Sequence, residues 1–157
     1  MINGTVMEEL VTKDIAKLLY ELGFDGFCLT YYEEHVETPR YSTSGKLYRS
    51  KLEEREKEHN KNSEWKVKYY LAPTQQMVKS WLREVHKIFI REDYRYFDNL
   101  CNFNNYLTEC YVEAKSMTNN GIIYYQYGPV DNFENIVNNV ISAVLDRLLV
   151  KKRKNEN

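Results

Sequence analysis

The chain contains no apolar run approaching the roughly 20 residues that a helix needs to cross a bilayer. Its first ten residues, MINGTVMEEL, contain neither the basic segment nor the apolar segment of a secretory signal peptide. It has only three cysteines, Cys28, Cys101 and Cys110, and so few cysteines fit reduced thiols better than a disulfide framework. From these absences we expect no membrane partner and a cytoplasmic location.

A net charge of either sign is also missing. The chain has 22 Lys and Arg against 23 Asp and Glu, so its composition carries no overall bias toward nucleic acid or acidic ligands. Its 157 residues are enough for one domain with a buried core. We predict a single domain over residues 1–150, followed by a basic tail, KKRKNEN, at residues 151–157.

Recognisable catalytic and metal-binding motifs are absent as well. The sequence has no HExxH, CxxC, glycine-rich phosphate loop or GxSxG. Residue type alone would pair Cys28 with His86 as thiol and base, or group Cys101 and Cys110 with a histidine around zinc. We therefore predict no catalytic residue, no metal site and no cofactor, and we expect a protein that is not an enzyme.

The best-patterned segment runs from Trp65 to Glu92, WKVKYYLAPTQQMVKSWLREVHKIFIRE. Alternating residues predict a strand that Pro73 ends, and Thr74 fits the N-cap of the helix that follows. A second strand begins at Ile88 almost without a loop. One face of this helix is apolar and contains Met77, Val78, Trp81, Leu82 and Val85. We expect Trp81 to lie in the core, docked on the sheet with Leu82 or Val85.

The N-terminal half combines a clear helix with a polar insertion. Residues 12–22 predict a helix between an N-cap at Thr12 and Gly23, and residues 27–32 predict a strand. Residues 33–64 are polar and highly charged, and they are either a mobile arm or a solvated insertion. We expect the insertion, with a short exposed helix at residues 50–60 and four anchoring residues, Tyr41, Leu47, Tyr48 and Leu52.

The C-terminal half predicts a hairpin and a long helix. Residues 93–105 are rich in aromatic residues and asparagine and predict a loop, and strands follow at residues 106–117 and 122–127. Between them, Asn119, Asn120 and Gly121 are the residues that a hairpin turn prefers. Helical spacing then continues over four turns to Leu149. The element order predicts an α+β domain, a mainly antiparallel sheet with about three helices packed on one face.

Aromatic residues give the pattern most suggestive of function. Alternation predicts that the sheet face packed on the helices contains Val67, Tyr69, Ile88, Ile90, Cys110 and Val112. Tyr70, Phe89 and Tyr111 then lie on the other face, together with Tyr32, Tyr124 and the cations Lys66, Lys68, Arg91 and Lys115. Such a face could be purely structural, through cross-strand aromatic pairing or a cover formed by the insertion; it could also be a protein interface, or a platform that stacks nucleic-acid bases. All three interpretations stay open at this point.

Three segments together resemble a family of small uncharacterised proteins encoded by bacteriophages and prophages of gut bacteria. They are DIAKLLYELGFDGFCLTYY, YYLAPTQQMVKSWLREVHKIFI and the capped helix near the C-terminus. The resemblance implies a phage-encoded accessory protein that acts in the host cytoplasm, and it implies no activity. The family's recurrent residues are expected to serve as helix cap, core and helix surface: Ala72, Pro73, Thr74, Gln75, Trp81, Leu82, Arg83 and His86.

We therefore expect a protein-binding module without catalysis, whose partner is a host or phage protein. The expected partner-binding residues are Tyr70, Phe89, Arg91 and Tyr111, and the same face could form the seam of a homodimer. The alternative function is a nucleic-acid-binding regulator that uses the same aromatic and basic face. The alternative surface is the basic stripe of the central helix, Lys79, Arg83 and Lys87.

Overall fold

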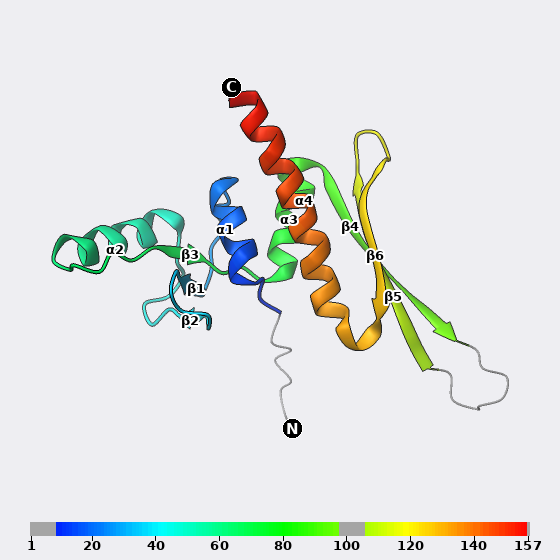
Figure 1. The fold of residues 1–157 in the computed structure, drawn as a ribbon, viewed down its shortest axis with the longest axis horizontal. Helices are drawn as coiled ribbons and strands as arrows, with labels where there is room; N and C mark the ends of the chain where they lie inside the picture. The colour runs from blue at the N-terminus through cyan, green and yellow to red at the C-terminus, as the bar shows by residue number, and fades with distance from the viewer. Residues whose placement is uncertain (1–8, 98–105, 157) are drawn as a thin grey trace. The chain divides into compact units, whose positions relative to one another are not determined.

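The computed structural model describes residues 9–97 and 106–156, and the chain forms two compact units, Met1–Val78 and Lys79–Asn157 (Figure 1). Each unit combines helix with a three-stranded antiparallel sheet, which confirms the α+β class. The described strands are divided between two sheets, whereas the sequence predicted one. No helix in the described part of the chain combines the length and the apolar character needed to cross a bilayer.

The first unit contains two helices and three short strands. The helices are α1 (Lys13–Glu21) and α2 (Arg49–Lys61), and the strands are β1 (Thr30–Glu33), β2 (Arg40–Tyr41) and β3 (Tyr69–Leu71). The sheet order is β2-β1-β3. As predicted, the Thr12 hydroxyl caps α1 by accepting a hydrogen bond from Ile15 N at 3.4 Å, and Gly23 follows the helix with φ +86°.

The polar insertion at residues 33–64 contains the predicted helix and is anchored at two of the four predicted positions. Leu47 and Leu52 are buried, and Leu47 forms two backbone hydrogen bonds with Cys28, of 2.7 and 3.0 Å. Tyr41 and Tyr48 are exposed, so their predicted anchoring role is wrong. The two leucines anchor the segment because aliphatic side chains gain most from full burial, while a tyrosine can leave its polar end in water.

Helix α3 (Gln75–His86) begins at the predicted cap, where Met77 N donates to Thr74 Oγ1 at 3.2 Å. Val78 and Leu82 are fully buried. Trp81 is only half-buried, so its predicted core position is wrong. Of the two residues expected beside it, Leu82 is buried and Val85 is exposed. The apolar face of α3 is wider than the stripe that is buried, and spacing alone does not show where that stripe ends.

The second unit contains a meander of long strands, β4 (Ile88–Phe97), β5 (Tyr106–Ser116) and β6 (Ile122–Pro129). Residues 93–97, predicted as part of a loop, continue β4, and residues 98–105 lie outside the described residues. The turn between β5 and β6 contains Asn120 with φ 56°, as the hairpin prediction requires.

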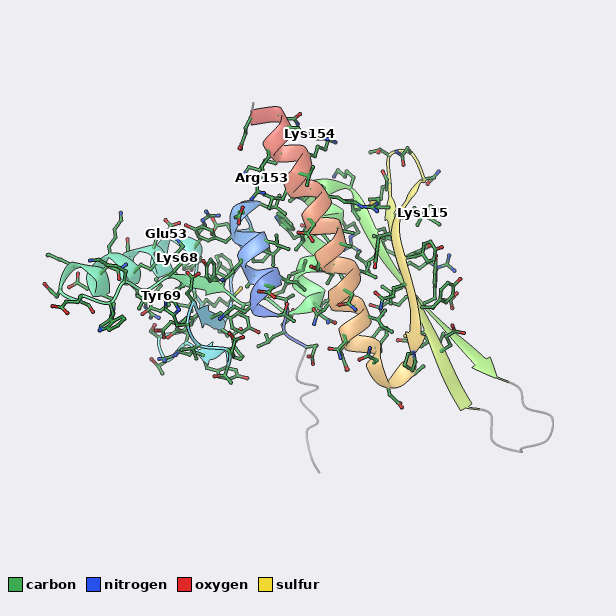
Figure 2. All side chains as sticks on the ribbon, in the orientation of Figure 1. Glu53, Lys68, Tyr69, Lys115, Arg153 and Lys154 are labelled. Carbon is green, nitrogen blue, oxygen red and sulfur yellow. The ribbon has the colours of Figure 1, made fainter. Side chains whose placement is uncertain are left out.

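A single 3-10 turn, η1 (Val130–Asn132), leads into the long helix α4 (Phe133–Glu156). The helix continues to Glu156, so residues 151–156, predicted as a frayed basic tail, are helical. Figure 2 shows Arg153 and Lys154 in this last part of α4. Six of its apolar side chains are fully buried or nearly so: Ile136, Val137, Val140, Ile141, Val144 and Leu145.

Helix α4 packs against one face of the β4-β5-β6 sheet, which we call the inner face (Figure 1). The ring of Tyr94 lies 5.5 Å from that of Phe133, and a Cβ on Gly128 would lie 2.3 Å from Ile136 Cδ1. The buried strand residues Ile88, Ile90, Cys110, Val112 and Ala114 share the inner face, as the sequence predicted for the first four. The alternate residues form the outer face.

Candidate functional site

The outer face of the β4-β5-β6 sheet brings together three of the four residues predicted to bind a partner. Phe89 and Arg91 lie on β4, and Tyr111 lies on the neighbouring strand β5. Strand register adds further side chains to the same face: Asp93, Glu109, Glu113, Lys115, Ile122, Tyr125 and Tyr127. Figure 2 labels Lys115 on this sheet.

Tyr70, the fourth predicted residue, is not part of this face. It lies on β3 in the first unit, and its side chain is buried. Its ring meets that of Tyr20 edge to face at 5.6 Å, and its hydroxyl donates to Glu34 Oε2 at 3.2 Å. Burial and the nearby Glu34 carboxylate raise the pKa of Tyr70 to about 12. The prediction is wrong because it joined strands that belong to two separate sheets, and Tyr32 is likewise buried in the first unit.

Three tyrosines from β5 and β6 form a cluster on the outer face. The ring centroids of Tyr111 and Tyr127 lie 4.7 Å apart, and those of Tyr111 and Tyr125 lie 5.9 Å apart. Tyr125 and Tyr127 meet nearly at right angles at 6.0 Å. They are 55% and 44% exposed, so much of this aromatic surface is open to solvent.

Tyr125 and Tyr127 were missed because Tyr124 was predicted to lie on the outer face. Tyr124 instead lies on the inner side of β6, where the guanidinium of Arg147 from α4 lies 6.0 Å from its ring centroid. The register between β5 and β6 shifts next to Lys115, and such a shift exchanges the two faces of a strand. The adjacent pair Tyr124 and Tyr125 indicates that one tyrosine of this strand faces outward, but the sequence does not show which of the two it is.

A carboxylate lies beneath the tyrosine cluster. Glu113 is only 5% exposed although its face of the sheet is not covered by α4. The hydroxyl of Tyr111 donates to Glu113 Oε2 at 2.7 Å, and this hydrogen bond, with burial, raises the pKa of Tyr111 to about 12. Arg91 places Nη1 3.7 Å from Glu113 Oε1 and Nη2 3.4 Å from Asp93 Oδ2.

The three residues of the alternative basic stripe on α3 differ in their exposure and contacts. Lys79 forms an ion pair with Glu92 on β4 and is largely buried. Arg83 and Lys87 are exposed, and Lys87 donates from Nζ to Glu84 O at 2.9 Å. Lys87 also ends the helix with φ 57°, which is an unusual conformation for lysine. With Lys79 paired, the stripe offers less free charge than the sequence suggested.

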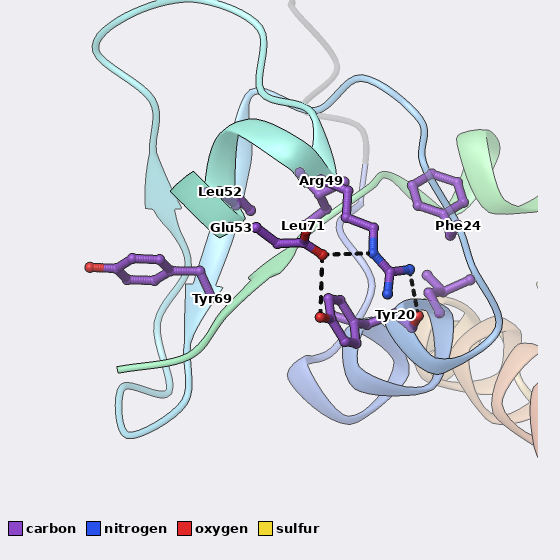
Figure 3. Close-up of a pocket in the computed structure, with 9 residues that line it drawn as sticks. Tyr20, Phe24, Arg49, Leu52, Glu53, Tyr69 and Leu71 are labelled. Carbon is purple, nitrogen blue, oxygen red and sulfur yellow. Dashed lines mark hydrogen bonds and ion pairs between the residues drawn. The ribbon is translucent and has the colours of Figure 1, made fainter. Parts of the chain in front are cut away.

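A small cavity in the first unit is too narrow to be a ligand site (Figure 3). Its volume is about 10 Å³, room for a single water at most. Along its wall, Arg49 donates to Glu53 Oε1 and to Tyr20 O, and Tyr20 donates to Glu53. These bonds attach α2 to α1. No cluster of three or more potential metal ligands occurs among residues 9–97 and 106–156.

Comparison with protein-family models, with curated proteins and with solved structures finds no match for this chain. The resemblance to bacteriophage proteins therefore stays a prediction. Function has to be inferred from the chain's own residues, and the outer face of the β4-β5-β6 sheet has the most informative chemistry among those described.

Proposed function

We propose that this chain is a protein-binding module without catalysis, and that the outer face of the β4-β5-β6 sheet is its contact surface. The observation that carries the proposal is the cluster of Tyr111, Tyr125 and Tyr127, in which Tyr125 and Tyr127 are about half exposed. The cluster lies on the same face as exposed Phe89 and Arg91. Contiguous aromatic patches are uncommon on monomers, and protein interfaces are enriched in tyrosine and arginine.

The exposed aromatic area is large enough to contribute to binding. A tyrosine buries about 150–250 Å², so the exposed halves of Tyr125 and Tyr127 each leave on the order of 100 Å² uncovered. Covering that area at about 25 cal/mol per Å² would contribute about 2.5 kcal/mol for each ring, before the costs of association. Two such rings supply the size of contribution expected of interface hot spots.

Charge favours a protein over a nucleic acid as the partner. The described side chains of the outer face include two cations, Arg91 and Lys115, and three carboxylates, Asp93, Glu109 and Glu113. Arg91 is already paired with two of those carboxylates. Nucleic-acid affinity depends mainly on cations that meet phosphates, and the described side chains of this face include no excess of cations.

The biological setting we propose is that of a phage-encoded accessory protein acting in the host cytoplasm, with a host or phage protein as partner. Support for this setting comes from the resemblance of three segments, most of all APTQQM and WLREVH at residues 72–77 and 81–86. The nucleic-acid-binding regulator remains the alternative, and the same aromatic rings could stack bases.

The test is a comparison of proteins recovered from host lysate by three immobilised chains: wild type, Tyr125→Ser with Tyr127→Ser, and Tyr41→Ser. Tyr41 is the control because it is also an exposed tyrosine, at 64%, and it lies in the first unit, away from this sheet. Wild type and Tyr41→Ser should recover the same partner, and the double variant should recover at least about tenfold less. Equal recovery by all three would contradict the proposal, and a salt-sensitive electrophoretic shift with nucleic acid would favour the alternative.

A further inference from the structure

We infer that the protein which occupies the outer face is a second copy of this chain. The two copies are related by a two-fold axis that runs across the strands at the level of Glu92, Val112 and Gln126. This inference rests on the proposed function, because it names the partner of the same face. It is carried by the strand register, which makes the outer face complementary to itself.

The register arranges the outer face in rows that cross all three strands. In one row, Arg91 on β4 pairs with Glu113 on β5, which pairs with Tyr125 on β6. In the other row, Asp93 on β4 pairs with Tyr111 on β5, which pairs with Tyr127 on β6. Between these rows lies the row of Glu92, Val112 and Gln126, whose side chains belong to the inner face.

A two-fold axis along that middle row places each outer row over the other row of the second copy. Arg91 then lies over the partner's Asp93, which is an attractive charge pair. Glu113 lies over the partner's Tyr111, an uncharged side chain, so the two copies' Glu113 carboxylates do not face each other. Tyr125 lies over the partner's Tyr127, and offset or edge-to-face aromatic pairs are favourable.

The rows farther from the axis are complementary too. On β5, Lys115 lies three residues after Val112 of the middle row, and Glu109 lies three residues before it. The same operation therefore places Lys115 over the partner's Glu109. On β6 it places Ile122 over the partner's Pro129, which is an apolar contact. No like charges meet among these described positions.

A two-fold axis that runs along β5 instead gives the opposite result. It places Glu113 over the partner's Glu113 and Lys115 over the partner's Lys115, and like charges that face each other destabilise an interface. Sheets that pack face to face keep their strands within about 30° of each other, so the strand directions of the crosswise arrangement are compatible with ordinary sheet packing. Charge thus selects the crosswise axis.

The exposed fractions identify Arg91 and Asp93 as the pair to test. Their side chains are 57% and 56% exposed, so both can reach a second copy without rearrangement of the sheet. They lie two residues apart on the same face of β4 and are opposite in charge, so a two-fold axis between them places each over its opposite charge in the second copy. Two-fold dimers are also the commonest assembly of soluble proteins, which makes a second copy the simplest occupant.

The experiment is a charge swap read by sedimentation velocity and light scattering at about 1–100 µM protein. Wild type should dimerise, and Arg91→Asp and Asp93→Arg should each weaken the dimer at least about 100-fold, because two like-charge contacts replace two attractive ones. An equimolar mixture of the two single variants should restore a mixed dimer. The chain carrying both substitutions should dimerise with itself. Lys115→Glu and Glu109→Lys form a second swap pair that serves if either first variant does not fold, as judged by circular dichroism.

Three results would overturn the inference. They are a wild-type chain that stays monomeric at 100 µM, a dimer that both single variants retain, and a mixture of folded single variants that stays monomeric. None of these results decides the proposed function, because recovery from lysate uses the tyrosine variants and detects proteins other than this chain. If no protein is recovered from the lysate but the charge swap restores the mixed dimer, the second copy of this chain is the partner of this face.

Discussion

Replacing Gly128 with alanine tests the packing that leaves the outer face uncovered. Gly128 lies opposite Cys110 on the inner face, and a Cβ there would lie 2.3 Å from Ile136 Cδ1 and 3.3 Å from Cγ1. Real Cβ atoms essentially never approach a neighbour this closely, so Ile136 or α4 must move. Ile136 is almost fully buried and has little room to move.

The expected cost of Gly128→Ala is about 1–3 kcal/mol of unfolding free energy, the range typical of an overpacked core. Gly128 does not have a positive φ, so its backbone conformation is open to alanine. Without the contact, alanine in a strand interior would stabilise the protein by roughly 0.5–1 kcal/mol. A net loss of stability therefore reports the contact with α4 and not backbone strain.

The assay is urea unfolding at one fixed protein concentration, since any dimerisation would make stability depend on concentration. Ile136→Val removes Cδ1 and alone should cost about 0.5–1.5 kcal/mol. With Gly128→Ala it should relieve the clash, so the double variant should cost less than the sum by about 1 kcal/mol. A neutral or stabilising Gly128→Ala, or strict additivity, would refute the packing of α4 on this face and with it the identity of the outer face.

Three further predictions concern other parts of the chain. Lys87→Gly should stabilise the protein by about 1 kcal/mol in urea unfolding, because Lys87 has φ 57° and glycine adopts this conformation without strain. Leu52→Ala should cost about 2–5 kcal/mol and speed tryptic cleavage between Lys46 and Lys61, because buried Leu52 anchors α2. In the folded protein the hydrogen bond to Glu113 raises the pKa of Tyr111 from its ordinary 10 to about 12. The stability that this bond contributes is therefore complete below pH 10 and is lost as pH rises toward 12. Absorbance titration should therefore show Glu113→Gln returning one late-titrating phenol toward pH 10, and an unchanged titration would contradict the hydrogen bond.

The sequence predicted the starts of two helices and the two faces of β4 and β5 correctly, because each depends on a local pattern. Thr12 and Thr74 cap α1 and α3 as expected, because a hydroxyl at the start of a helix satisfies an otherwise unpaired N–H. Ile88, Ile90, Cys110 and other inner-face residues alternate with exposed residues, because a strand with one covered face has a period of two.

Strand pairing and register were not predictable in the same way. Alternation assigns residues to the two sides of a strand but does not say which strands share a sheet, so Tyr70 was grouped with Phe89 and Tyr111 although it lies in another sheet. The register shift next to Lys115 exchanged Tyr124 for Tyr125 on the outer face. The continuation of β4 through residues 93–97 was missed because aromatic and charged residues there resemble a loop.

Hydroxyl-radical footprinting of the tyrosines tests most directly whether the outer face is a protein contact surface. In a single chain Tyr125 and Tyr127 are about half exposed and Tyr41 is slightly more so, which makes Tyr41 an internal reference. Raising the concentration from about 1 to 100 µM should lower oxidation of Tyr125 and Tyr127 severalfold relative to Tyr41. Equal oxidation ratios at both concentrations, and in the complex recovered from host lysate, would contradict the account.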